Sequence, residues 1–334
     1  MSKWFLLSEQ QRREIFNQVS TQTGLPATAV EKDWWVTLVL RAVFSLPVAD
    51  SLIFKGGTSL SKGWNLIERF SEDIDLALDR SFLGFEGDLS KTQVKKLRKA
   101  SCAFISGDLM GWLDRKLKEM DIPDISLALQ DFQDSDTDPL VIEVQYTALT
   151  GSSTYIQPRV LIEIGGRSLR EPFEERNIQS LVGQQYGEQP FADDPVPIPT
   201  VLPERTFLEK IFLLHEEFQK PHRAIRVHRL SRHLYDLEKL MDTKYGERAL
   251  ADKELYDTIV AHRQKFNLVR GIDYTNHARG KINFIPSAEI SKAWEKDYQT
   301  MRESMIYGET KTFPELLARL NELKNRLSGQ MSDT

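Results

Sequence analysis

The sequence predicts an α+β protein, in which a mixed sheet with flanking helices precedes an all-helical C-terminal domain. Short apolar or alternating segments typical of strands are confined to residues 51–164. Five prolines crowd residues 190–203, and beyond them the pattern is helical, including a capping box that opens the last helix. We therefore expect two domains, residues 1–190 and residues 204–330.

The N-terminal region is expected to begin with two helices. Ser8 and Gln11 have the spacing of a capping box, and the second helix spans residues 29–44. Further along, the pattern predicts strands over 51–55, 73–78, 140–147 and 159–164, a short helix over 59–68 and a long basic helix over 91–120.

The composition is that of an ordinary globular protein. The chain has 334 residues, 40% of them hydrophobic, and a formal charge of 44 − 49 = −5. A single cysteine, Cys102, excludes an intrachain disulfide and a cysteine-based zinc site, and we expect an inert buried thiol. The most apolar stretch, residues 34–48, is too short to span a bilayer. We expect a protein of the reducing cytoplasm, with Trp34 and Trp35 in its core.

The mild net charge hides a strong local pattern. Residues 121–145 hold seven acidic side chains and no Lys or Arg, whereas residues 219–233 hold five Lys or Arg, three His and no acid. Without the acidic stretch the chain would carry −5 + 7 = +2. A polyanion could therefore find a basic surface here.

The sharpest chemical signal is Phe54-Lys-Gly-Gly-Thr-Ser59, followed by a short helix and then Ser71-Glu-Asp-Ile-Asp-Leu76. Because side chains alternate along a strand, Ser71, Asp73 and Asp75 are expected on one face. Two such carboxylates can share a pair of divalent cations, and Gly56 with Gly57 lets backbone amides approach a phosphate. This combination indicates phosphoryl or nucleotidyl transfer. A glycine turn beside two solvated aspartates is the structural alternative.

The stretch FKGGTSLSKGWNLIERFSEDIDLAL resembles the AbiEii/AbiGii-type nucleotidyltransferase toxins of the DNA polymerase β-like superfamily. EKDWWVTLVLRAVF before it, and ARGKINFIP with AWEKDYQTM after it, resemble the same family. Thr58 stands where Ser or Gly is common, and the spacer before Asp73 is long. The resemblance implies a nucleotidyltransferase-like sheet, two Mg²⁺ ions and an NTP substrate. It also implies that Asp73 and Asp75 bind the metal, while Gly56, Gly57, Thr58 and Ser71 hold phosphates.

A third metal-binding carboxylate is expected on a neighbouring strand, because two cations need more than two anionic ligands. Glu163 and Glu143 each stand inside an otherwise apolar strand, and the residues alone leave both open. The resemblance of VLIEIGGR to the toxin family favours Glu163. An edge strand with a solvated charge is the alternative.

The resemblance also implies roles for two residues beyond the prolines. The family places a functional Lys on the helix after the connector and an Asp downstream of it, which Lys210 and Asp236 match. Lys210 would neutralise the charge of the triphosphate. Asp236 would either orient Lys210 or bind the nucleotide, which would be held between the two domains. By residue pattern alone, Lys210 is a solvated lysine beside core residues.

The basic segment over 219–233 bears on the acceptor. The basic segment suggests an RNA surface formed by Arg223, Arg226, Arg229 and Arg232, with a solvated loop as the alternative and the helix over 91–120 as the next candidate. By resemblance, the protein is a toxin of a toxin–antitoxin or phage-defence system. Its acceptor would be the 3′ end of tRNA, its effect a block of translation, and its partner an antitoxin.

Two other functions stay open on the sequence. The same core could transfer nucleotides to a protein or a small molecule, or the chain could be a non-catalytic RNA- or antitoxin-binding protein. The presence of both Asp73 and Asp75 argues against the non-catalytic alternative.

Overall fold

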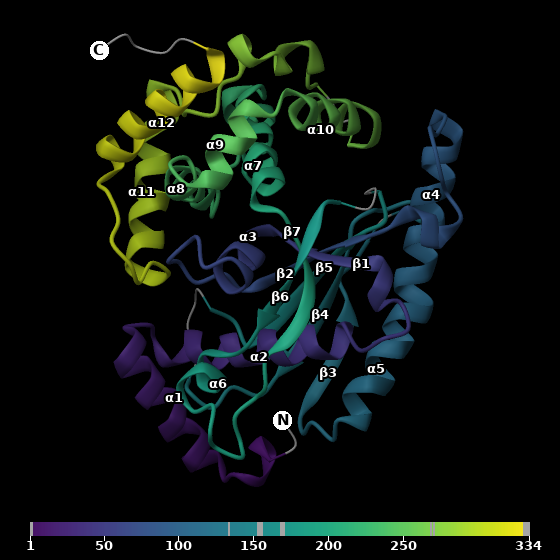
Figure 1. Cartoon of the computed structure of the whole chain (residues 1–334), viewed down its shortest axis with the longest axis vertical. Helices are drawn as coiled ribbons and strands as arrows, with labels where there is room; N and C mark the ends of the chain where they lie inside the picture. Colours follow the sequence, from purple (N-terminus) through teal and green to yellow (C-terminus); the bar gives the residue numbers. More distant parts are fainter. Residues whose placement is uncertain are drawn as a thin grey trace. The chain divides into compact units, whose positions relative to one another are not determined.

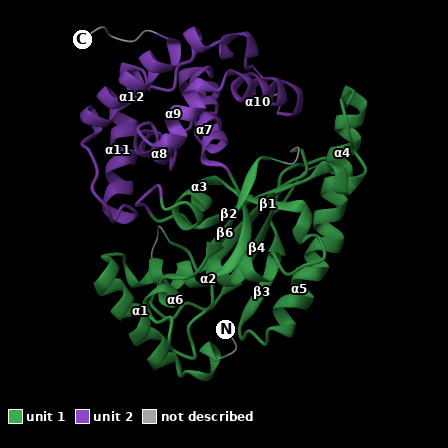
Figure 2. Cartoon of the chain, viewed as in Figure 1, with its two compact units in different colours: residues 1–65, 70–201 green, residues 66–69, 202–334 purple. Residues whose placement is uncertain are grey.

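A computed structural model describes residues 3–132, 134–151, 156–167, 171–267, 269 and 271–329. The chain divides into two compact units, which Figure 2 colours separately. Unit 1 comprises residues 1–65 and 70–201, and unit 2 comprises residues 66–69 and 202–334. The short segment Leu66–Arg69 thus belongs to unit 2, although its chain neighbours on both sides belong to unit 1.

Unit 1 is built on a seven-stranded mixed sheet with the strand order β3-β4-β5-β2-β1-β7-β6 (Figure 1). Strand β2 runs parallel to β5, and β1 runs parallel to β7, while the other neighbours are antiparallel. The mixed sheet and the helical C-terminal region confirm the predicted fold class. The strands are β1 (Leu52–Lys55), β2 (Asp73–Leu78), β3 (Ile125–Leu129), β4 (Leu140–Tyr146), β5 (Arg159–Gly165), β6 (Phe173–Ile178) and β7 (Val196–Val201).

The helices of unit 1 begin with the two that the sequence predicts. The capping box of Ser8 and Gln11 is present at the start of α1. The long basic helix forms as α4, a π-helical turn (η5) and α5 in direct succession. The α-helices are α1 (Glu9–Thr23), α2 (Ala27–Val43), α3 (Gly56–Thr58), α4 (Lys91–Phe104), α5 (Met110–Glu119) and α6 (Leu181–Gln185), with shorter turns η1 (Trp4–Leu6), η2 (Ala49–Ser51), η3 (Ser59–Gly63), η4 (Arg80–Leu83) and η5 (Ile105–Leu109).

One face of the sheet is apolar and covered by helix α2. The even-numbered side chains of β2 and β5, such as Ile74 and Ile162, are fully buried. Trp35 of α2 stacks on Tyr146 of β4 with ring centroids 4.6 Å apart, and Trp34 is buried beside it. Both tryptophans are therefore core residues, as expected. Because side chains alternate, the odd-numbered residues of β2 and β5 lie on the opposite face.

The proline-rich connector is where the sequence prediction was wrong. Residues 196–201 do not form an irregular segment but strand β7, which pairs along its length with β6. Pro197 and Pro199 are two residues apart, so both missing N–H groups fall on one side of the strand. The N–H groups on its other side remain available for pairing, and the strand tolerates the prolines.

Two further elements differ from expectation. The helix predicted over 59–68 is shorter, since α3 and the π-helical turn η3 end at Gly63 and Asn65 adopts a positive φ of 52°. Strands β3 and β6 were not predicted; both are edge strands of the sheet. Cys102 is buried, and burial raises the pKa of its thiol, which agrees with an inert side chain.

The named elements of unit 2 are all helices, apart from an isolated β-bridge between Arg69 and Ile306, and apolar side chains such as Phe207, Leu234, Trp294 and Leu320 are fully buried in its core. The expected capping box is present at Thr312. Among the described residues, no helix is long and apolar enough to cross a membrane. The α-helices are α7 (Pro203–Phe218), α8 (Ser231–Leu240), α9 (Lys244–Ala251), α10 (Lys253–Phe266), α11 (Ala288–Ser304) and α12 (Phe313–Ser328), with turns η6 (His222–Ala224), η7 (Tyr274–His277) and η8 (Arg279–Lys281).

Candidate active site

Three carboxylates share one face of the unit 1 sheet. Asp73 and Asp75 are two residues apart on β2 and share the face opposite the α2-covered side. Strand β5 is the parallel neighbour of β2, and its register places Glu163 directly beside Asp75. Neighbouring strands are ~4.8 Å apart, and alternate residues of a strand are ~7 Å apart. The pairing therefore brings all three predicted carboxylates into one row, which we call the carboxylate row.

The glycine pair that begins α3 borders this row. Gly56 has a φ of +80°, which favours glycine over any residue with a side chain. A Cβ atom on Gly56 would lie 1.8 Å from Oδ2 of Asp75, so a side chain has no room there. The turn thus needs glycine for its backbone conformation and for the close approach of a carboxylate. Gly57 follows within α3.

The predicted phosphate-binding hydroxyls are linked to β2. Thr58 is fully buried, and its hydroxyl donates a hydrogen bond to the backbone carbonyl of Asp73. The hydroxyls of Thr58 and Ser71 also share a hydrogen bond of 3.0 Å. Ser71 itself is only half-buried. Thr58 therefore fixes α3 against the strand that carries the aspartates, and Ser71 is the more accessible of the two hydroxyls.

A residue without a role in the sequence analysis also faces the carboxylate row. Lys55 ends β1 and pairs in register with Asp75, on the side opposite Glu163. The three side chains thus lie in the order Lys55, Asp75, Glu163 across three adjacent strands. Its place directly before the glycine pair was visible in the sequence. Only the strand pairing, however, shows that Lys55 lies beside Asp75 on the same face of the sheet.

The environments of Glu163 and Glu143 differ. Glu143 shares the sheet face but lies one strand further out, opposite Leu161, and pairs with Arg159 at 2.7 Å. Burial opposes ionisation of Glu143, but hydrogen bonds from Gln145 and Arg159 lower its pKa overall. Glu163 is exposed and makes no ion pair or hydrogen bond within the described part of the chain. This contrast supports Glu163 as the carboxylate that is available to a ligand.

The carboxylate row fits Mg²⁺ by its chemistry. All three side chains offer the carboxylate oxygens that Mg²⁺ prefers, and the absence of a Cβ on Gly56 lets the Asp75 carboxylate lie against the glycine turn. As the side chains stand, no three His, Cys, Asp or Glu residues among those described are grouped closely enough to hold an ion.

Lys210 and Asp236 form a closed ionic cluster inside unit 2. Asp236 of α8 is completely buried and receives two hydrogen bonds from Arg69, of 2.6 and 2.7 Å. Lys210 of α7 lies 2.8 Å from the same carboxylate, and His233 lies 3.5 Å from the lysine. The structure thus brings the two predicted residues together and adds Arg69. Arg69 and Lys210 thus both bind the carboxylate of Asp236, and this shared contact orients their side chains.

The protonation of this cluster follows from its burial. Burial alone would raise the pKa of Asp236, but Arg69 and Lys210 hold that pKa well below its usual range. Burial lowers the pKa of Lys210, and Asp236 offsets part of the effect. Burial and the charge of Lys210 likewise keep the pKa of His233 low, so its imidazole is neutral. Sequence reasoning missed Arg69, because an arginine is usually exposed.

The predicted basic segment is partly neutralised by acids from elsewhere in unit 2. Arg226 and Lys220 both pair with buried Glu217, and Asp297 accepts a hydrogen bond from the backbone N–H of Arg229. Arg232 is half-buried near Lys210 and lowers the pKa of His233 together with it. Of the four predicted arginines, only Arg223 is exposed without an ion pair among the described residues.

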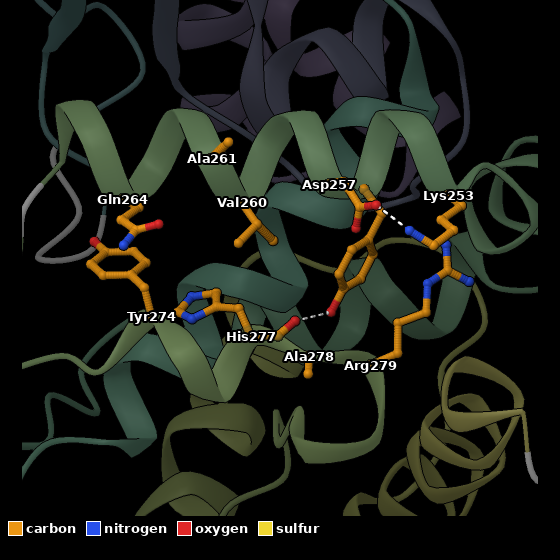
Figure 3. A pocket seen from close by; sticks show the side chains of 10 residues that line it. Lys253, Asp257, Val260, Ala261, Gln264, Tyr274, His277, Ala278 and Arg279 are labelled. Atoms are coloured by element: carbon orange, nitrogen blue, oxygen red, sulfur yellow. Dashed lines mark hydrogen bonds and ion pairs between the residues drawn. The ribbon is translucent and has the colours of Figure 1, made fainter.

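A separate cavity of about 570 Å³ lies within unit 2, between α10 and the segment that contains η7 (Figure 3). Tyr274 and Gln264 line one end, and Lys253 and Arg279 line the other. Arg279 stacks on Tyr256, with its guanidinium carbon 4.7 Å from the ring centroid. None of the predicted site residues lines this cavity.

Similarity to known proteins agrees with the resemblance seen in the sequence. Two solved structures are similar at low identity. JHP933 from Helicobacter pylori is 14% identical, with a TM-score of 0.43, and the match covers 90% of this chain and 93% of that chain. The nucleotidyltransferase toxin MenT4 from Mycobacterium tuberculosis is 17% identical, with a TM-score of 0.43, and the match covers 95% of this chain and 99% of that chain. No curated protein matches the sequence significantly. Residues 39–319 match the model of the family described as "Nucleotidyl transferase AbiEii toxin, Type IV TA system". The chain therefore belongs to the AbiEii nucleotidyltransferase toxin family of type IV toxin–antitoxin systems.

Proposed function

We propose that this toxin transfers nucleotides from an NTP to an RNA acceptor, with the 3′ end of tRNA as the acceptor that fits the family resemblance. The carboxylate row of Asp73, Asp75 and Glu163 beside the glycine turn is the observation that supports the proposal. Membership of a type IV toxin–antitoxin family implies an antitoxin partner. Blocked aminoacylation of the extended tRNA would stop translation, and defence against phage is one setting for such a toxin. NTPs and RNA meet in the cytoplasm, where we place the reaction.

In the proposed reaction, the acceptor hydroxyl forms a new ester bond to the α-phosphorus of the NTP. The bond from that phosphorus to the oxygen bridging the β-phosphate breaks, pyrophosphate leaves, and the hydroxyl proton passes to water. Bound Mg²⁺, which we expect as two ions, supplies positive charge to the attacking and leaving oxygens. Asp73, Asp75 and Glu163 are the residues that would hold it.

The chain's own groups would hold the triphosphate. Backbone amides of Gly56 and Gly57 can approach phosphate oxygens, because no Cβ intervenes. The half-buried hydroxyl of Ser71 is available on the same side as Asp73, and buried Thr58 keeps that hydroxyl in place. Lys55 faces Asp75 and would add a positive charge beside the phosphates. The family resemblance further implies that Lys210, which pairs with Asp236, contacts the triphosphate.

The proposal is tested by incubating the purified protein with Mg²⁺, total RNA and one α-labelled NTP at a time. We expect label in RNA of tRNA size for at least one NTP. Label in protein or in a small molecule would favour the alternative acceptors. Absence of any labelled product with all four NTPs would support a non-catalytic binding protein and overturn the proposal.

A further inference from the structure

Helix α4 has an unusual charge composition. It carries Lys91, Lys95, Lys96, Arg98 and Lys99 within the sequence KTQVKKLRKASCAF, and it contains no acid. Every other described α-helix longer than two turns contains Asp or Glu. Lysines four residues apart face each other on a helix and repel, so Lys91, Lys95 and Lys99 destabilise the free helix. The helix therefore carries a repulsion that an anionic partner would remove.

The four lysines form one exposed strip. At 3.6 residues per turn, Lys91, Lys95, Lys96 and Lys99 fall within ~140° of the helix circumference and extend over ~12 Å of its axis. All four are exposed, and within the described part of the chain none makes an ion pair or a hydrogen bond through its side chain. Arg98 is half-buried and is therefore left out of the strip. We call these four residues the α4 lysine strip.

Helix α4 is anchored to the strand that carries Glu163. Gly166 follows the end of β5, and a Cβ on it would lie 2.7 Å from the hydroxyl of Ser101 in α4. Asp138 connects the two, since it accepts a hydrogen bond of 3.1 Å from the backbone of Gly166 and lies 3.4 Å from the Ser101 hydroxyl. The lysine strip is thus fixed to the same rigid sheet as the carboxylate row.

The basic segment over 219–233 makes a useful contrast. Its charges were the stronger signal in sequence, but Glu217 binds Lys220 and Arg226, and Glu289 binds His222. A cation that is already paired must give up its partner before it binds a phosphate. The α4 lysine strip has no such partner to lose, so it offers the more effective surface for a polyanion.

We propose that the α4 lysine strip binds the phosphate backbone of the acceptor RNA. This inference rests on the proposed RNA acceptor and names the surface that receives it. A bound phosphate backbone would neutralise the four lysines and release the counterions that accompany the nucleic acid. An acidic protein, such as an antitoxin, is the competing partner that the experiment separates.

The test compares two quadruple variants with wild type. The first replaces the strip by glutamine, which keeps helix propensity and removes charge. The control removes the same number of charges from lysines that pair with acids: Lys116, Lys118, Lys253 and Lys311. Binding of fluorescent bulk tRNA is measured over a series of salt concentrations, with circular dichroism to verify the helices.

We expect the slope of log affinity against log salt to flatten by about three in the strip variant and to stay near the wild-type value in the control. Equal slopes in wild type and the strip variant would overturn the inference. An unchanged tRNA slope together with lost antitoxin binding would overturn it in favour of an acidic protein. If the strip determines tRNA binding but no nucleotide reaches RNA, the inference stands and the proposed function fails.

Discussion

Two groups of charged side chains in this protein are held in opposite ways. In unit 1, the carboxylate row lies on one face of a sheet, with Glu163 exposed beside Asp75. In unit 2, Asp236 is completely buried and shares its carboxylate between Arg69 and Lys210. The first group gathers three carboxylates on one face of the sheet, whereas the second combines one carboxylate with two cations. We propose that the first arrangement binds a cation, whereas the second is paired within unit 2.

The largest expected effect comes from removing an aspartate of the carboxylate row. Asp73→Ala and Asp75→Ala should each reduce nucleotide transfer by ~10³-fold or more, because each removes a carboxylate that we propose holds the metal. The free energy of unfolding should change by less than about 1 kcal/mol, since neither side chain is in the core. Transfer rates, growth arrest and melting curves check this. Undiminished growth arrest in both variants would contradict the assigned site.

The next largest effect comes from neutralising Asp236 in the buried cluster of unit 2. Asp236→Asn should lower the free energy of unfolding by ~3–5 kcal/mol, because it leaves Arg69 and Lys210 buried without their anion. Asp73→Asn is the matched control, because it makes the same chemical change at a half-buried position. Denaturant titrations of both variants measure the difference. Equal stability losses would show that the two groups are not held differently.

A smaller effect concerns the choice of the third carboxylate. Glu163→Gln should reduce transfer by ~10²-fold, because it removes a charge next to Asp75. Glu143→Gln should change the rate much less, since Glu143 pairs with Arg159. Single-turnover rates at saturating Mg²⁺ and NTP give the comparison. A larger loss from Glu143→Gln would assign the third ligand to β4.

The smallest effect is a pH dependence inside unit 2. Burial and the neighbouring His277 lower the pKa of His215 from 6.5 to about 4. Because the folded pKa is depressed, the unfolded chain binds the proton more readily between those two values. Stability from this site is therefore complete above pH 6.5 and is lost as the pH falls toward 4. His215→Gln should flatten the dependence of melting temperature on pH in this window. An unchanged pH profile would show that His215 does not cause this dependence.

The sequence predicted those parts that depend on local pattern. Alternation placed Asp73 and Asp75 on one face of a strand, and the capping boxes at Ser8 and Thr312 formed as expected. Strand β7 was missed because prolines normally interrupt sheets, and the charged edge strand β6 lacks apolar alternation.

The features of the site that the sequence did not predict depend on pairing between residues far apart in the chain. The adjacency of Glu163 and Asp75 depends on the register between β2 and β5, which no local pattern encodes. The same holds for Lys55, which faces Asp75 only once β1 and β2 have paired. The burial of Arg69 depends on Asp236, far away in the chain, so its sequence neighbours gave no indication of it.

The position of a radioactive label in the NTP tests the central claim most directly. The protein is incubated with Mg²⁺ and bulk tRNA, in parallel with α-labelled and γ-labelled forms of each NTP. Nucleotidyl transfer at the carboxylate row predicts that tRNA acquires the α label and never the γ label, which leaves as pyrophosphate. It also predicts no labelled tRNA with Asp73→Ala. Transfer of the γ label to tRNA, or α labelling that survives in Asp73→Ala, would contradict the account.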